Sequence, residues 1–520
     1  MIAGPAHLIR LGHAGFVFAH EGVFAGIDTT LLPPPARAAV RLARLIERPA
    51  SAVAANRIVA ALTRLGPAYV KLGQFLATRP DVVGVALARE LETLQDKMAP
   101  FSQVDAERAV AAALGKPLSD LFASFGAPVA AASIAQVHRA AVSTDRGLRA
   151  VAVKVLRPGV ERRFKVDLDA FTFAARSAEK ISAEARRLRL VEVVETLRRT
   201  VAIEMDLRFE AAAASELSEN FAGDPAFRVP QVDWRRTGRT VLTTERIGGI
   251  RVDDREALIA AGHSIDDLLR NAADAFFKQV FRDGFFHADL HPGNMFVEAD
   301  GTLAVVDFGI MGRLDRATRY YLADMLIGFL TGDYRRVAEV HFDAGYVPRQ
   351  RSLDAFTQAC RSIGEPILGR PLHEISIARL LAQLFQVTEQ FEMETQPQLL
   401  LLQKTMVLVE GVGRRLDPDV NIWSLARPLI EEWMRDNRGP EARLRQQIDT
   451  VLETLDEIPR LLRSLDRLVG DWSREGVILH AESLATQAAH RARLFPLLVL
   501  PLWFAAAALV AIAVAVVAGR

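Results

Sequence analysis

The sequence predicts an α+β fold with two lobes, a helical N-terminal extension, a large helical C-terminal lobe and a C-terminal transmembrane helix. Strand-like apolar runs concentrate in the second hundred residues, apolar spacing typical of helices dominates on either side, and an uncharged apolar run lies near the end. At 520 residues, the chain also exceeds one ordinary domain. The predicted units are a helical and linker segment (1–50), a helical extension (51–120), a small lobe (121–250), a large helical lobe (251–440), an amphipathic helical segment (441–493) and an anchor (494–519).

The N-terminal part predicts helices without a secretory signal. Residues 1–22 lack the long apolar core and the small-residue cleavage site of a signal peptide, so we expect no export. A proline cluster at residues 33–35 marks a boundary, and the basic run after it predicts a surface helix. The stretch RIVAALTRLGPAYVKLGQFLATRPDVV then shows the apolar spacing of helices and forms the predicted extension.

Strand and turn patterns locate the two lobes. The segments PVAAASIAQVHRAAV and LRAVAVKVLRPGV flank a polar turn at residues 143–147 and predict an antiparallel hairpin, and RTVLTTERI predicts a further strand. The amphipathic helix DDLLRNAADAFFKQVFRDGFF leads into HADLHPGN, and MFVEADGTLAVVDFG predicts a second hairpin around Asp300 and Gly301. Residues 314–438 have helical periodicity almost throughout.

The C-terminal end predicts membrane attachment. Residues 494–519 carry no charge, and Arg491 and Arg493 precede this run whereas only Arg520 follows it. The positive-inside bias favours a position of the lobes on the cytoplasmic side. We expect the anchor to lie in the inner (cytoplasmic) membrane. An apolar stripe over residues 445–469 fits core packing, self-association or a position along the membrane surface equally well.

Charge and cysteine content exclude several classes of protein. The 64 Lys and Arg residues nearly cancel the 63 Asp and Glu residues, which leaves no global basic field for binding nucleic acid. The single cysteine, Cys360, can form neither an internal disulfide nor a Cys-rich metal site. This cysteine usage fits a reducing cytoplasm.

The motif HADLHPGN, which begins at His287, carries the first chemical signal. Asp289 and Asn294 have the spacing found in the catalytic loop of protein kinases, where the aspartate orients the attacking oxygen and the asparagine holds Mg²⁺. Asp307 follows in a DFG tripeptide, where the second Mg²⁺-binding carboxylate belongs. The alternation of His287, Asp289 and His291 could also imitate a zinc site, but the sequence offers no further cluster of His or Cys.

A lysine and an acidic helix complete this set. Lys154 ends the strand-like VAVK and can reach the α- and β-phosphates of ATP. Its acidic partner is to be found among Glu204, Asp206 and Glu210 in EMDLRFE. These four features follow one another in the same order as in a kinase: the lysine, the acidic helix, the Asp-Asn loop and the DFG tripeptide. The sequence therefore predicts a protein-kinase-like two-lobe fold that binds ATP and Mg²⁺.

The sequence resembles the UbiB/ADCK family of atypical protein-kinase-like proteins. The resemblance covers about residues 60–315, with the motifs in the family's order. These motifs are YVKLGQFLATRPD with its Lys71-x-Gly73-Gln74 pattern, AAASIAQVH in place of a glycine loop, the Glu204-x-Asp206 pair, HADLHPGN and VVDFG.

This resemblance implies a role for each matching residue of the kinase set. Lys154 would hold the nucleotide, and Glu210 would be its salt-bridge partner. Asp289 would be the catalytic aspartate. Asn294 and Asp307 would hold Mg²⁺.

The resemblance also implies a family-specific extension that folds across the active site. Lys71 and Gln74 belong to it, and Lys71 would face Glu204, which places all three near the nucleotide. Such an extension occupies space that a protein substrate would need.

An alanine segment stands where kinases have their phosphate-covering glycines. Each Cβ of Ala130, Ala131 and Ala132 hinders positive φ angles and the close approach of N–H groups to phosphate, both of which glycine allows. Ser133 is a candidate hydroxyl near the phosphates. With the covering extension, these alanines favour ATP hydrolysis over phosphorylation of other proteins.

The family resemblance implies a membrane-anchored, Mg-dependent ATPase that supports ubiquinone (coenzyme Q) biosynthesis. Its partners would be membrane lipids or polyprenyl-phenol precursors, the biosynthetic enzymes, or a second copy of the chain. Relatives often have two terminal membrane segments, whereas the apolar run here is long enough for one. The sequence shows no flavin or NAD fingerprint and no cluster of iron ligands that would indicate an oxygenase.

Two alternatives stay open. HADLHPGN also resembles the catalytic loop of aminoglycoside and choline kinases, which would make the chain a small-molecule kinase, although the KLGQ extension argues against this. The other alternative is a nucleotide-binding scaffold without turnover. The intact set of Asp289, Asn294 and Asp307 disfavours such a scaffold.

Overall fold

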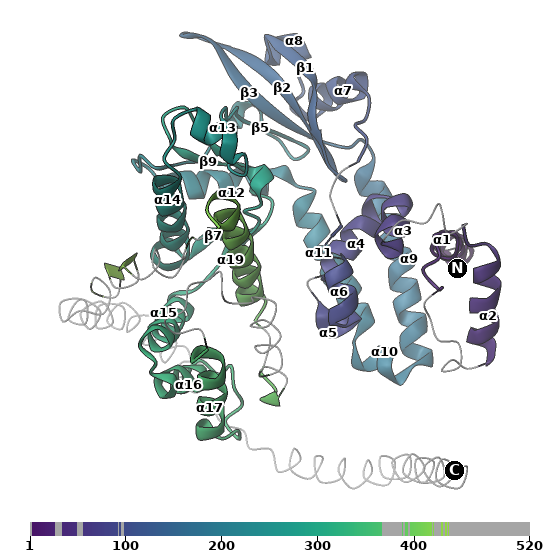
Figure 1. The fold of residues 1–520 in the computed structure, drawn as a ribbon. Coiled ribbons are helices and arrows are strands. Elements are labelled where there is room, and N and C mark those ends of the chain that lie inside the picture. The colour runs from purple at the N-terminus through teal and green to yellow at the C-terminus, as the bar shows by residue number, and fades with distance from the viewer. Residues whose placement is uncertain are drawn as a thin grey trace, which may run out of the picture. The chain divides into compact units, whose positions relative to one another are not determined.

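The structure, a computed structural model, describes most of the chain up to residue 366 and shorter stretches beyond it. The described residues are 3–25, 34–48, 56–77, 79–91, 93–94, 98–366, 387, 390–393, 396–418, 420, 428–429, 432–433 and 435. The chain divides into two units, Met1–Trp433 and Met434–Arg520, and Arg435 is the one described residue of the second. The elements labelled in Figure 1 all belong to the first unit.

Helices form the N-terminal part, as the sequence predicts. Asn56 caps α3 (Arg57–Leu65) by accepting a backbone hydrogen bond from its first turn, and Gly66 ends that helix with φ 103°, an angle that suits glycine. The other helices here are α1 (Ala3–His20), α2 (Pro34–Leu45), α4 (Pro67–Ala77), α5 (Pro80–Val83), α6 (Val85–Leu91), α7 (Gln103–Leu114) and α8 (Leu118–Leu121).

Figure 1 shows the strands of the small lobe as one sheet. The strands are β1 (Ser124–Ala131), β2 (Ala135–Thr144), β3 (Gly147–Leu156) and β5 (Val241–Glu245). They pair antiparallel in the order β1-β2-β3-β5, and β2 and β3 form the predicted hairpin. Alternation along β3 buries Val153 and Val155 completely, which places Lys154 on the opposite face of the sheet.

One apolar core joins the extension to the small lobe. Helices α9 (Val160–Ile181) and α11 (Leu190–Glu204) pack against each other and against α4. Tyr69 of α4 meets Phe171 of α9 edge to face, with ring centroids 4.9 Å apart. Gly73 permits this close packing of α4, because a Cβ there would lie 2.5 and 2.8 Å from two leucine side chains. The same core contains Ile134, Leu156, Leu207 and Leu242 of the small lobe.

The large lobe combines short strands with helices. Its elements are α13 (Arg255–Ala260), α14 (Ile265–Phe277), the π-helical turn η4 (Lys278–Asp283), α15 (Arg316–Thr331), α16 (Tyr334–Asp343), α17 (Leu353–Gly364), α19 (Pro397–Leu416), β4 (Phe227–Arg228), β6 (Ile250–Arg251), β7 (Phe285–His287), β8 (Met295–Val297), β9 (Leu303–Val305) and β10 (Met311–Arg313). Four of the strands form a sheet in the order β4-β9-β8-β6, and β7 pairs with β10. The hairpin predicted around Asp300 and Gly301 is the antiparallel pair β8 and β9.

Two predicted features lie outside the described residues, namely the apolar stripe over residues 445–469 and the membrane anchor over residues 494–519. Among the helices of the described residues, none combines the length and the apolar character needed to span a bilayer. The boundaries of the predicted sequence units stay predictions.

Candidate active site

Lys154, Glu210 and Asp307 meet where β3, α12 (Leu207–Asn220) and the segment after β9 come together. The Nζ atom of Lys154 donates to both carboxylate oxygens of Glu210, at 2.8 and 3.0 Å, and to Oδ1 of Asp307 at 2.8 Å. The side chains of Lys154 and Glu210 are 18% and 9% exposed, whereas half of the Asp307 side chain is exposed. The cluster therefore opens to solvent at Asp307.

Burial and charge shift the pKa values of all three groups. Burial alone would lower the pKa of Lys154, but the carboxylates of Asp307 and Glu210 outweigh it and raise that pKa. Burial raises the pKa of Glu210 to about 7, against the opposing charge of Lys154. The same Lys154 charge holds the pKa of Asp307 well below its usual range. The exposed end of the cluster is thus a firmly ionised carboxylate beside a cation.

The predicted catalytic loop follows β7 and passes through the 3₁₀ turn η5 (Pro292–Asn294). Asn294 donates from Nδ2 to the Asp289 carbonyl at 3.1 Å, so its Oδ1 atom is the oxygen it can offer to a metal. His287 is fully buried, with Nδ1 accepting the Asp289 N–H at 3.1 Å and Nε2 lying 3.2 Å from the Val306 carbonyl. These bonds hold the loop against the strand that leads to the DFG tripeptide.

Asp307 has a left-handed backbone with φ 65°. This region is uncommon for residues other than glycine, and Asn and Asp tolerate it best. Phe308, the next residue, is 3% exposed, and its ring meets the His287 ring at 5.5 Å. The buried ring anchors the segment while the backbone turn carries the Asp307 carboxylate to Lys154.

The alanine segment closes the turn between β1 and β2. The Ala132 N–H donates to the Ala135 carbonyl at 2.8 Å, and Arg157 donates from Nη2 to the Ala132 carbonyl at 3.2 Å. Arg157 was not identified as a site residue from the sequence. Its position directly after the VAVKVL strand is the feature that could have indicated it. Across the turn, Ala130 is exposed, Ala131 and Ala132 are half-buried, and Ser133 is fully buried.

Lys71 connects the extension to the junction between α11 and α12. Its Nζ atom lies 2.8 Å from Oε2 of Glu204, and the two side chains are 14% and 16% exposed. Glu204 ends α11, and Asp206 caps α12 by accepting a backbone hydrogen bond from its first turn at 3.1 Å. Gln74 is half-buried about one turn further along α4. The extension thus contacts the segment that positions Glu210, which is the member of the acidic set that meets Lys154.

We expect the ion pair of Lys71 and Glu204 to stabilise the fold. Lys71→Met leaves a mostly buried Glu204 carboxylate without this cation, whereas Lys71→Met combined with Glu204→Gln leaves no such charge. Each single variant should lower the free energy of unfolding by about 1–3 kcal/mol, and the double-mutant cycle should give a coupling energy of about 1 kcal/mol. Urea unfolding of the four proteins measures these values, and strictly additive losses would contradict the pairing.

We expect His287 to make the fold sensitive to acid. Burial lowers the pKa of His287, so the unfolded chain binds a proton at this residue as the pH falls through about 6.5 while the folded chain does not. The stability that His287 contributes is present above that pH and is lost below it. Between about pH 7.5 and about pH 5.5, without metal or nucleotide, the wild type should lose more unfolding free energy than His287→Gln. Equal losses in the two proteins would contradict this assignment.

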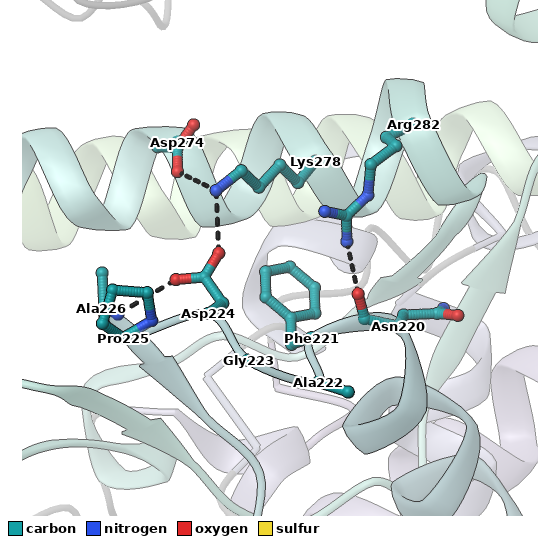
Figure 2. A pocket seen from close by; sticks show the side chains of 10 residues that line it. All are labelled: Asn220, Phe221, Ala222, Gly223, Asp224, Pro225, Ala226, Asp274, Lys278 and Arg282. Carbon is teal, nitrogen blue, oxygen red and sulfur yellow. Dashed lines mark hydrogen bonds and ion pairs between the residues drawn. The ribbon is translucent and has the colours of Figure 1, made fainter.

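A separate hollow of about 440 Å³ lies between the loop after α12 and the helical run of α14 and η4 (Figure 2). Lys278 bridges Asp224 and Asp274, at 2.8 and 2.6 Å, and Arg282 donates to the Asn220 carbonyl at 2.7 Å. The predicted site residues do not line this hollow. Its charged groups pair with one another and tie the loop after α12 to the helix that leads into the catalytic loop.

The oxygen donors of the site fit Mg²⁺ and a nucleotide. Asp307 and Asn294 offer a carboxylate and an amide oxygen, which hard cations prefer. The Asn294 carbonyl accepts the Val306 N–H at 2.9 Å, so the two ligand-bearing segments are hydrogen-bonded to each other. Lys154 supplies the cation that phosphate oxygens require, and the 28% exposed Asp289 is accessible to an acceptor. The arrangement is therefore suited to phosphoryl transfer.

Comparison with known proteins assigns the family. The family model of the ABC1 atypical kinase-like domain matches residues 93–341, and that of the UbiB helical domain matches residues 360–421. The chain is 42% identical over 465 residues to "Probable protein kinase UbiB" of Marinobacter nauticus, covering 88% of this chain and 84% of that protein. The chain belongs to the UbiB family.

A second relative agrees with this membership. The UbiB-family chain is 42% identical over 425 residues to "Probable protein kinase UbiB" of Azotobacter vinelandii, covering 81% of this chain and 78% of that protein. A solved complex of Rv3197 with erythromycin from Mycobacterium tuberculosis matches with a TM-score of 0.47 and 25% identity, over 70% of this chain and 92% of that one. The predicted resemblance to the UbiB/ADCK family is confirmed, and so is a kinase-like fold of mixed helix and sheet.

Proposed function

We propose that this UbiB-family chain hydrolyses ATP with the help of Mg²⁺. The observation that carries the proposal is the contact of Lys154 with both Glu210 and Asp307, because it brings together a cation for the phosphates and a carboxylate for the metal. Asn294 would be the second metal ligand, and Asp289 would orient the attacking water. Mg²⁺ would neutralise charge on the phosphate oxygens.

Water is the proposed acceptor in place of another protein. Hydrogen bonds to Arg157 and Ala135 hold the backbone of the alanine turn. The backbone N–H groups that this turn can present to phosphate therefore differ from those of a glycine loop. The extension shares an apolar core with the small lobe and is tied down by the ion pair of Lys71 and Glu204. An extension held in this way supports exclusion of a large substrate from the site.

We infer a role in ubiquinone biosynthesis from membership of the UbiB family. The partner would be a membrane lipid or polyprenyl-phenol precursor, or the enzymes that process it. The apolar sequence of residues 494–519, outside the described part, supports attachment to the inner membrane with the lobes on the cytoplasmic side.

Ubiquinone content tests this role. In a bacterium that lacks its own UbiB-family protein, the wild-type chain should restore ubiquinone, whereas Asp307→Asn, present at equal level in the membrane fraction, should not. Full restoration by Asp307→Asn would contradict a role for ATP turnover and favour a nucleotide-binding scaffold. Stoichiometric transfer of phosphate to a small alcohol or phenol would favour a small-molecule kinase.

A further inference from the structure

A lysine of helix α19 reaches the catalytic loop. The Nζ atom of Lys404 lies 3.3 Å from Oδ1 of Asp289, and the two side chains are 46% and 28% exposed. Helix α19 lies within residues 360–421, which match the UbiB helical domain, and outside the kinase-like match at residues 93–341. A side chain of the helical domain therefore contacts the proposed catalytic aspartate.

Packing fixes the position from which Lys404 extends. Val412 and Leu416 of α19 line a small apolar cavity of about 30 Å³ together with leucines of α14, and α19 also contacts β10. Arg255 donates to the Leu416 carbonyl at 2.7 Å, which secures the end of the helix. Thr405, next to Lys404, is fully buried. The helix backbone is thus held in place while the lysine head group reaches toward the loop.

The catalytic loop itself supplies no basic side chain of the Lys or Arg type. Neither residue occurs between His287 and Asn294, and Nδ1 of His291 is occupied as the acceptor of the Gly293 N–H at 2.8 Å. Phosphoryl transfer requires the carboxylate beside the acceptor to hold the attacking oxygen in line with the phosphate. It also requires nearby cations that balance the negative charge of the phosphate oxygens. Lys404 is the basic residue that pairs with Asp289 in the described part of the chain.

We infer that Lys404 is a positioning residue for Asp289, so that the helical domain completes the active site. This inference rests on the proposed ATPase function. A surface-type pair between two partly exposed side chains stabilises a fold very little. The effect of the pair therefore lies in orientation, with one Asp289 oxygen held by Lys404 and the other left for the attacking water.

Kinetics of Lys404 variants test the inference. We expect Lys404→Met to lower kcat about tenfold with the KM for Mg-ATP unchanged within about twofold and the thermal unfolding midpoint unchanged. Lys404→Arg, which keeps the charge, should restore most of kcat. Arg415 is a matched control on the same helix, 3.5 Å from Asp253, and Arg415→Met should keep the wild-type kcat. Equal kcat values for Lys404→Met and Arg415→Met would overturn the inference.

A second comparison shows whether Lys404 acts by positioning Asp289 or by a general effect on the large lobe. In an Asp289→Asn background, adding Lys404→Met should cause no further loss of kcat, because the group that it positions has already changed. A further tenfold loss would mean that Lys404 acts elsewhere.

Chemical labelling tests the contact even if the wild type releases no phosphate, a result that would defeat the proposed ATPase alone. Reductive methylation of the Lys404 amine, read by mass spectrometry against exposed Lys165, should be about two- to fivefold faster in Asp289→Asn than in the wild type. Equal rates in the two proteins would overturn the pairing.

Discussion

Asp307→Asn should reduce Mg-dependent ATP turnover by about 10²- to 10³-fold. The substitution replaces an ionised carboxylate, the proposed metal ligand, with a neutral amide, and Lys154 keeps its second partner, Glu210. Asparagine also tolerates the left-handed backbone of Asp307 at φ 65°, so the fold should persist. Phosphate release in excess Mg²⁺ measures the loss.

A matched control for this variant lies in the neighbouring hairpin. Asp300 is exposed, and its Oδ1 accepts the Thr302 N–H at 3.0 Å, a bond that asparagine can also accept. Asp300→Asn should therefore keep wild-type turnover. Nucleotide binding by Asp307→Asn in EDTA should also persist, since the change removes only a proposed metal ligand. Turnover by Asp307→Asn equal to that of the control would contradict the metal role of Asp307.

Lys154→Met should lower both nucleotide affinity and stability. It removes the cation shared by Glu210 and Asp307, leaving two carboxylates side by side. Breaking a buried pair costs about 3 kcal/mol of unfolding free energy, and the half-exposed side chain of Asp307 reduces this figure. Nucleotide affinity should fall at least about tenfold, because a charge-assisted contact to phosphate is lost. Urea unfolding and ADP titration measure the two effects.

The loss of stability in Lys154→Met should depend on pH. Burial already raises the pKa of Glu210 to about 7, and removal of the Lys154 charge should raise it further. A carboxyl group whose folded-state pKa is raised favours the folded state below that pKa and loses this contribution as the pH rises through it. The destabilisation by Lys154→Met should therefore be larger at about pH 8 than at about pH 5.5. Lys165→Met, at an exposed lysine of α9, should cause neither effect, and a pH-independent loss in Lys154→Met would contradict the assignment.

Local patterns were sufficient to predict the strands and turns that position the site. Both hairpins follow from strand alternation around polar turns, and the same alternation places Lys154 opposite the buried valines of β3. Three acidic residues in one short segment were candidates for the partner of Lys154. Without the resemblance, the sequence could not decide among them, because the choice depends on how α12 is capped and docked. Asp206 caps that helix and Glu204 points to the extension, which leaves Glu210 for the lysine.

Three other contacts between segments were beyond sequence reasoning. Arg157 is close to Lys154 in the chain, but its bond to the Ala132 carbonyl depends on the turn before β2. Lys404 is 115 residues from Asp289 in the sequence. Nothing in its position along α19 distinguishes it from an ordinary exposed lysine of a helix. The parallel pairing of β4 with β9 likewise joins segments that no local pattern connects. Each of these depends on tertiary packing.

One measurement decides where the phosphate goes. Purified wild-type protein is incubated with Mg²⁺ and γ-labelled ATP, with and without anionic liposomes and a ubiquinone-precursor-like phenol, and free phosphate and bound label are counted in the same sample. We predict free phosphate that depends on Mg²⁺ and accumulates over many turnovers, with bound label staying below one per chain, and loss of release in Asp307→Asn. Label on protein or phenol in excess of free phosphate, or nucleotide binding with no release under any condition, would contradict an ATPase.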